Sequence, residues 1–182
     1  MPSRSMRPML WVMRCLRLLL PILAGCSIAD FDVDQKIPEQ RVPGSAIPGP
    51  LAALFPVPIT LDLESKIKAM DTGPIDSVTL SSLALTITAT ARPTGDTDDW
   101  SFCTNVDVFI ESRKAGTTLP KVKIASVAMP GAVQTMTFAV ESGVNVKPYV
   151  DEGSQVDTTG SGTAPSDEVS YDGKAVFTVH PL

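Results

Sequence analysis

Histidine is nearly absent from this chain, so few residues remain that could drive catalysis at neutral pH. The 182 residues include one histidine, His180, and three cysteines. A zinc site takes several histidine and cysteine ligands, which this set does not supply. The sequence also lacks Gly-x-Ser-x-Gly, a phosphate-binding glycine loop and His-Glu-x-x-His. These absences argue against an enzyme, and we expect His180 to be a solvated residue at a frayed end of the chain.

Aromatic side chains make up only 5% of the sequence, which weakens the case for a carbohydrate-cleaving enzyme. Glycosidases set two carboxyl groups across a cleft, and aromatic rings usually cradle the sugar. Twenty acidic residues supply carboxyl pairs by chance, but after residue 25 the large aromatic rings are Trp100, Tyr149 and Tyr171, with a few phenylalanines. We therefore predict no catalytic residues.

Long hydrophobic runs are absent as well. The N-terminal run, Leu18 to Ala24, falls far short of the roughly 20 residues that span a bilayer. The first 25 residues hold no acidic residue and four arginines, which are Arg4, Arg7, Arg14 and Arg17. A basic start, a short apolar run and small residues after it are typical of a secretory signal, residues 1–25. An uncleaved N-terminal anchor helix is the alternative interpretation.

Leu23-Ala24-Gly25-Cys26 ends this stretch and resembles the lipobox of bacterial lipoproteins. The resemblance covers residues 1–26 only. It implies that the Cys26 thiol receives a diacylglyceryl group, that a peptidase cuts before Cys26, and that the new amino group is acylated. Two or more acyl chains give a stable membrane anchor. Because Ser27 follows, where aspartate marks retention in the inner membrane, the resemblance favours the outer membrane of the bacterial cell envelope.

Charge and cysteine usage change once the leader is removed. All twenty acidic residues follow Cys26 against eleven basic ones, so the formal charge becomes about −9 in place of −5. Nucleic acid and anionic head groups require basic patches, so we expect as partners the membrane, through the lipid, and another envelope protein. Cys103 remains as the one free thiol, which excludes an internal disulfide. Its apolar surroundings predict a buried, inert thiol.

Residues 26–58 show no sustained hydrophobic period and contain six prolines: Pro38, Pro43, Pro48, Pro50, Pro56 and Pro58. Prolines this dense disfavour a sheet or a helix. We expect an extended tether that lifts the domain on the order of 50–90 Å from the membrane. Asp30, Asp32 and Asp34 would solvate it, and Leu51–Phe55 would dock as a short helical turn.

From residue 59 onward the hydrophobic period is two, which is typical of half-buried strands. A phase change near Ser81 predicts a β-bulge there, and Asp172-Gly173 predicts a two-residue hairpin turn. Strong strands are expected at residues 59–68, 78–90, 105–111 and 135–141, and weaker ones at Lys121–Ala128, Gly153–Gly160 and Lys174–Val179.

About seven strands and no long helical stretch predict an all-β fold, an antiparallel Ig-like β-sandwich over residues 59–182, with a closed barrel as the alternative. The disulfide of immunoglobulin domains is missing. Tyr149–Gly153, the glycine-rich Thr158–Thr163 and a last strand ending near Val179 resemble the end of late-embryogenesis-abundant-type sandwich domains. This resemblance implies a small Ig-like sandwich without enzymatic activity.

Asp96, Asp98 and Asp99 form the sharpest polar cluster in the sequence, in a loop between two predicted strands. Oxygen ligands at alternate positions suit Ca²⁺, although the glycine and distal glutamate of an EF-hand loop are missing. A solvated turn that protects a strand edge is the other interpretation. We therefore expect a lipid-anchored envelope protein whose non-enzymatic sandwich binds or scaffolds a partner, without a cofactor other than the lipid. The alternative is a calcium-dependent ligand- or carbohydrate-binding module.

Overall fold

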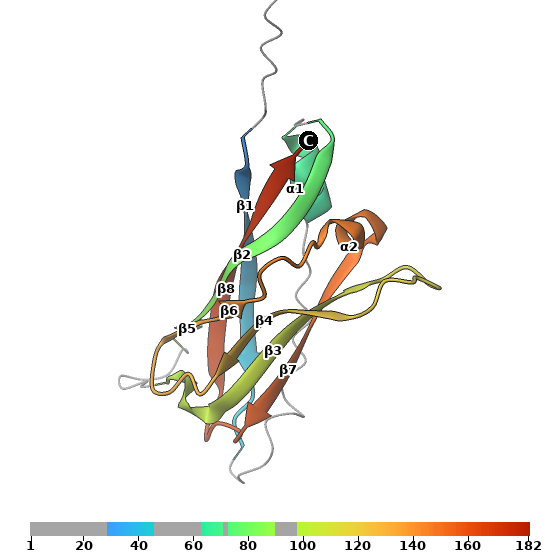
Figure 1. Ribbon diagram of the computed structural model, residues 1–182. Coiled ribbons are helices and arrows are strands. Elements are labelled where there is room, and N and C mark those ends of the chain that lie inside the picture. The colour runs from blue at the N-terminus through green and yellow to red at the C-terminus, as the bar shows by residue number, and fades with distance from the viewer. Residues whose placement is uncertain (1–28, 46–62, 71–72, 90–97) are drawn as a thin grey trace, which may run out of the picture.

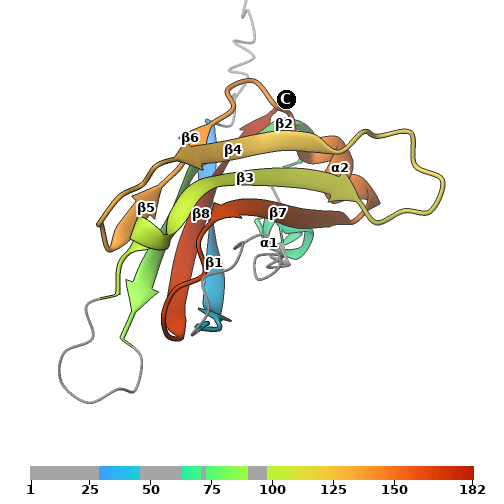
Figure 2. The same cartoon turned by 90° about the horizontal axis from the view of Figure 1, so that it is seen from below.

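The computed structural model describes residues 29–45, 63–70, 73–89 and 98–182. They form two four-stranded antiparallel sheets packed face to face (Figures 1 and 2). Sheet 1 has the strand order β1-β8-β2-β5, and sheet 2 has the order β6-β4-β3-β7. The elements in chain order are β1 (Phe31–Val42), α1 (Leu63–Ala69), β2 (Ile75–Thr88), the 3₁₀ helix η2 (Trp100–Phe102), β3 (Cys103–Ser112), β4 (Val122–Ala128), β5 (Thr135–Thr137), β6 (Ala139–Val140), α2 (Lys147–Glu152), β7 (Ser154–Gly162) and β8 (Val169–Pro181).

The predicted antiparallel β-sandwich is confirmed, with eight strands in place of about seven. Its core lies between the sheets. It consists of the residues of each strand that face inward, which alternate with more exposed ones. Trp100 is fully buried, its Nε1–H donates to the Gln134 carbonyl at 3.1 Å, and its ring meets that of Tyr171 edge-on at 5.3 Å between centroids. The indole donor is therefore satisfied inside an apolar core.

The first strand lies within the segment that we expected to be a tether. β1 pairs with β8 from Phe31 opposite Val179 to Val42 opposite Val169. Val33 and Ile37 are buried, while Asp32 and Asp34 are exposed. The alternation of acidic residues that we attributed to tether solvation is thus the exposed side of a strand. The expected linker over 26–58, and the domain start at residue 59, are corrected to a sandwich that includes β1.

Proline does not prevent this strand because Pro38 falls at an irregularity. The register of β1 against β8 shifts between Ile37 and Gln40. β1 is the outer strand of sheet 1, and proline is tolerated at bulges and on edge strands because no ladder bond then needs its missing N–H. Pro43 lies just after the strand. The other four prolines, and the predicted turn at Leu51–Phe55, lie outside the described residues.

A helix replaces the second half of the strand predicted at 59–68. α1 buries Leu63 and Ile67, which are four residues apart and therefore share one helix face. Glu64 accepts a hydrogen bond from Lys68 Nζ at 2.6 Å, which raises the pKa of Lys68. An i,i+4 pair of this orientation supports a helix. The apolar residues of this segment fit both the period of a strand and the spacing of four of a helix face. The predicted strand was wrong here.

Asp172-Gly173 does not form the predicted hairpin turn, because it lies in the middle of β8. Gly173 stands opposite Ile37 of β1 and Leu85 of β2. A Cβ atom on Gly173 would lie 2.5 Å from Leu85 Cδ2 and 2.7 Å from the Ala84 carbonyl oxygen. The glycine is therefore explained by the close approach of neighbouring strands and not by a turn.

Two further strand predictions have different outcomes. The bulge near Ser81 is confirmed, because the register of β2 against β8 shifts between Leu80 and Ser82. The strand predicted at 135–141 is divided into β5, which pairs with β2 in sheet 1, and β6, which pairs with β4 in sheet 2. Phe138 lies at the crossing point with 5% of its surface exposed. A strand that passes from one sheet to the other forms a corner of the sandwich.

Candidate functional site

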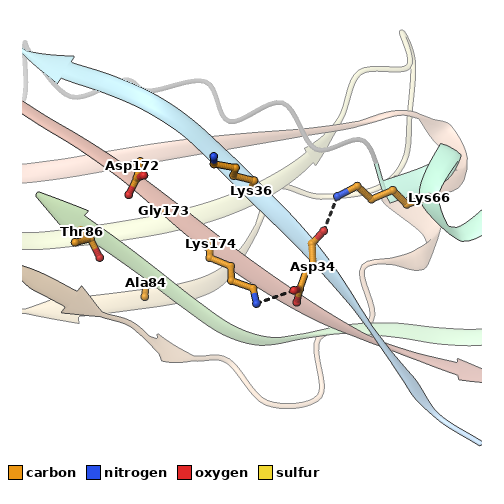
Figure 3. Close-up of a pocket in the computed structure, with 8 residues that line it drawn as sticks. All are labelled: Asp34, Lys36, Lys66, Ala84, Thr86, Asp172, Gly173 and Lys174. Carbon is orange, nitrogen blue, oxygen red and sulfur yellow. Dashed lines mark hydrogen bonds and ion pairs between the residues drawn. The ribbon is translucent and has the colours of Figure 1, made fainter. Parts of the chain in front are cut away.

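The outer face of sheet 1 carries a hollow, by which we mean the depression of about 480 Å³ lined by Asp34, Lys36, Lys66, Ala84, Thr86, Asp172, Gly173 and Lys174. Figure 3 shows that its residues come from β1, β8, β2 and α1. Ala84, which stands opposite Lys174 in the register of β2 and β8, has a short side chain, so the sheet face is low between the longer lysines. The alternation of each strand turns the charged residues outward, away from the core.

The charges around the hollow are only partly paired. Lys174 Nζ lies 2.7 Å from Asp34 Oδ2, and Lys66 Nζ donates to the main-chain carbonyl of Asp34 (Figure 3). The side chains of Lys36 and Asp172 make neither a hydrogen bond nor an ion pair with any residue that the structure describes. The hollow therefore offers one ammonium group and one carboxylate to an incoming ligand. Sequence reasoning missed it, because its residues come from four elements that are far apart in the chain.

His180 lies in β8, and it is not the frayed residue that we expected. Its Nδ1 is 2.9 Å from Asp30 Oδ2, and its Nε2 is 3.4 Å from Thr79 Oγ1. The order hydroxyl, imidazole, carboxylate is that of a hydrolase triad. The Oγ1–Nε2 distance is long for a hydrogen bond, and the Asp30 side chain is 61% exposed. We interpret the three residues as a polar link across β2, β8 and the residue before β1.

The predicted calcium ligands are only partly placed. Asp96 lies outside the described residues. Asp99 caps η2, where its Oδ1 accepts the Ser101 N–H at 2.9 Å, and the hydrogen bonds with Ser101 lower its pKa. Within the described ranges, no three His, Cys, Asp or Glu residues are grouped so that they could hold a metal ion. Calcium binding by Asp96, Asp98 and Asp99 stays a prediction.

Hydrogen bonds to one carboxylate, which the sequence did not indicate, join α2 to the end of β3 and the loop after it. Glu152 accepts hydrogen bonds from Thr117 Oγ1 at 2.6 Å, Ser112 Oγ at 2.8 Å and Lys114 Nζ at 3.1 Å. These donors lower the pKa of Glu152 to about 2. Since three donors already occupy this carboxylate, it holds the β3–β4 hairpin against α2. No local pattern relates Glu152 to residues so far back in the chain.

Cys103 is buried, as predicted, and is the free cysteine of the described residues. Burial raises the pKa of its thiol to about 12, so the thiolate that would react is disfavoured. Burial, and secondarily the charge of Cys103, also raise the pKa of Tyr171. Cys26 and the leader lie outside the described residues. Among those that are described, no helix is long and apolar enough to cross a membrane.

Comparison with known proteins does not assign a family. No protein family matches the chain, and no curated protein matches it. Among solved structures, the chain is similar to the decameric BFDV capsid protein, with a TM-score of 0.41, 11% identity, and coverage of 83% of this chain and 96% of that one. It is also similar to turnip yellow mosaic virus, with a TM-score of 0.31, 12% identity, and coverage of 90% and 86%. Likenesses this distant say nothing of activity or assembly.

Proposed function

We propose that this protein is a lipid-anchored component of the bacterial cell envelope, with the outer membrane favoured, whose β-sandwich binds a partner and catalyses no reaction. The anchor is supported by the basic, apolar leader and by the lipobox-like Leu23-Ala24-Gly25-Cys26. The absence of a catalytic motif from the sequence fits a binding role. The hollow on sheet 1 is the surface that we assign to the partner.

The unpaired side chain of Lys36 is the observation that best supports a binding role. Its ammonium group is unpaired among the described residues, although the whole chain has a net charge of −5. Lys174 stands opposite Lys36 in the register of β1 and β8, so two positive side chains lie close together on one face. Lys174 already pairs with Asp34, so it is the ammonium group of Lys36 that favours a ligand with a phosphate or carboxylate group. Asp172 beside them would select a partner that also offers a hydrogen-bond donor.

The anchor is tested by Cys26→Ser in the native host. We expect the variant to keep its leader and to lack the lipid, because the lipoprotein peptidase acts on the lipidated cysteine. Mass spectrometry of the wild type should show a diacylglyceryl group on Cys26. A Cys26→Ser protein whose leader is still removed before residue 26, or a wild type without the lipid, would contradict the proposal.

The hollow is tested with inorganic phosphate as the probe and melting temperature as the readout. A ligand that binds the folded state raises the melting temperature by mass action, while the general salt effect is common to all variants. We compare Lys36→Gln with Arg113→Gln, since both remove one positive charge that pairs with no described carboxylate. The rise should be smaller in Lys36→Gln than in Arg113→Gln. Equal rises would remove the hollow as an anion site.

A further inference from the structure

The distance between the predicted anchor and the sandwich is short. β1 begins at Phe31, which pairs with Val179 of β8, and Asp30 is already joined to His180. Phe31 is the fifth residue after Cys26, and five fully extended residues span at most about 18 Å. The expected lift of 50–90 Å is therefore impossible from Cys26, because the chain joins the sheet almost at once.

The two ends of the sandwich are set by the register of sheet 1. The near end carries the start of β1, the end of β8 and the start of β2, since Phe31 pairs with Val179 and Ile75 with Pro181. The far end carries Val42 opposite Val169. Figure 1 shows α1 at the near end, beside the start of β1. Twelve residues of β1 at a rise of about 3.3 Å each separate the ends by roughly 40 Å.

Each end exposes one methionine. Met70 follows α1 at the near end and is 47% exposed, while Met129 is 79% exposed. Met129 belongs to the far end, because its N–H donates to the carbonyl of Thr104, at the start of β3. Figure 1 shows the start of β3 at the opposite end of the molecule from α1. Positions 70 and 129 are therefore suited to probes that report on the near end and the far end separately.

We propose that the near end, which carries Asp30, Met70, Pro74 and His180, rests on the lipid head groups and that the far end points away from the membrane. The inference rests on the proposed lipidation of Cys26. The occupant of the near end is the bilayer surface itself, because the length of chain before β1 allows no larger object between them. The hollow then lies within about 35 Å of the lipid, since Lys36 is ten residues from Cys26.

The experiment uses the full lipidated protein in phosphatidylcholine vesicles that contain a head-group spin-label quencher. One thiol-reactive fluorophore is placed at Met70→Cys and, in a separate protein, at Met129→Cys. Cys103 does not interfere, because burial raises the pKa of its thiol to about 12. The probe at residue 70 should be quenched several times more strongly than the probe at residue 129. Equal quenching, or stronger quenching at residue 129, overturns the orientation.

Failure of the anchor and failure of the orientation give different results. If mass spectrometry shows no lipid on Cys26, the proposed function itself is wrong. If the lipid is present and residue 129 is quenched as strongly as residue 70, only the orientation is wrong. A further variant inserts about twelve glycine and serine residues after Ser27, which adds about 20 Å of flexible reach. Quenching at residue 70 should then fall, and unchanged quenching contradicts the role of the short connection.

Discussion

The two sheets differ in how far apart their strands lie in the sequence. Sheet 2 takes β3, β4, β6 and β7, which all fall between Cys103 and Gly162. Sheet 1 pairs β1, the first strand, with β8, the last described one, from Phe31 opposite Val179 onward. Closing a long loop costs more chain entropy than closing a short one. Sheet 2 should therefore form first, and sheet 1 should complete the sandwich.

The largest expected effect comes from emptying the core beneath each sheet. Phe177 of β8 is 1% exposed and Ile110 of β3 is fully buried. Phe177→Ala should lower the free energy of unfolding by about 3–5 kcal/mol and Ile110→Ala by about 2–5 kcal/mol. If sheet 2 forms first, Ile110→Ala slows folding, whereas Phe177→Ala mainly speeds unfolding. Stopped-flow kinetics in urea measure both rates, and slower folding in Phe177→Ala alone would break the comparison.

A smaller effect is expected from crowding the centre of sheet 1. In Gly173→Ala the new Cβ would lie 2.5 Å from Leu85 Cδ2, so the strands must move apart. We expect a loss of about 1–3 kcal/mol, the usual range for an overpacked core. The neighbouring Lys174→Ala removes only an exposed pair with Asp34 and should cost about 0–1 kcal/mol. Urea denaturation of both variants measures the difference, and an unchanged Gly173→Ala would contradict the close approach.

The smallest effect is expected from the hydrogen bonds that hold Glu152, beside sheet 2. Donors from Thr117, Ser112 and Lys114 lower the pKa of Glu152 from 4.5 to about 2. A carboxyl group with a lowered pKa stabilises the folded state above its unfolded pKa, and this contribution is lost as the pH falls through the folded value. The melting temperature of the wild type should fall between pH 4.5 and pH 2, and Glu152→Gln should lack this part of the fall.

The control for this experiment is Glu111→Gln. Glu111 accepts one hydrogen bond, from Gln155 Nε2 at 3.1 Å, so its replacement should leave the acid-induced fall nearly intact. Melting temperatures are measured across the pH range for the wild type and both variants. A Glu152→Gln curve parallel to that of the wild type would show that the three donors do not favour the ionised carboxylate.

The same contrast explains what the sequence could predict. In sheet 2, the strands predicted at 105–111, 121–128 and 153–160 lie close to β3, β4 and β7, and no proline interrupts them. In sheet 1, the prolines led us to predict a tether where Val33 and Ile37 of β1 are buried. The dipeptide Asp172-Gly173 led us to predict a turn within β8. Gly173 is set by contacts with two other strands, which no local pattern contains.

The candidate site was beyond sequence reasoning for a similar reason. The hollow exists because Lys36, Ala84 and Lys174 lie side by side in the register of three strands. Their relative position depends on which strands are neighbours in the sheet, and the strand order cannot be derived from the pattern of one sequence. The burial of Cys103, by contrast, was predictable because it lies beside an apolar strand and close to Trp100 and Phe102 in the chain. The acidic cluster at Asp98 and Asp99 was visible, but the capping role of Asp99 depends on where η2 begins.

The position of β1 at the rim of sheet 1 bears on self-association. An outer strand with free main-chain groups is a template on which a second molecule can extend the sheet and start aggregation. Here the irregularity around Pro38 interrupts the repeat, and Lys66 of α1 occupies the carbonyl of Asp34. Molecules confined to a membrane meet one another far more often than molecules in solution. If Cys26 is lipidated as proposed, the blocked rim would let many copies crowd on one surface without polymerising through this strand.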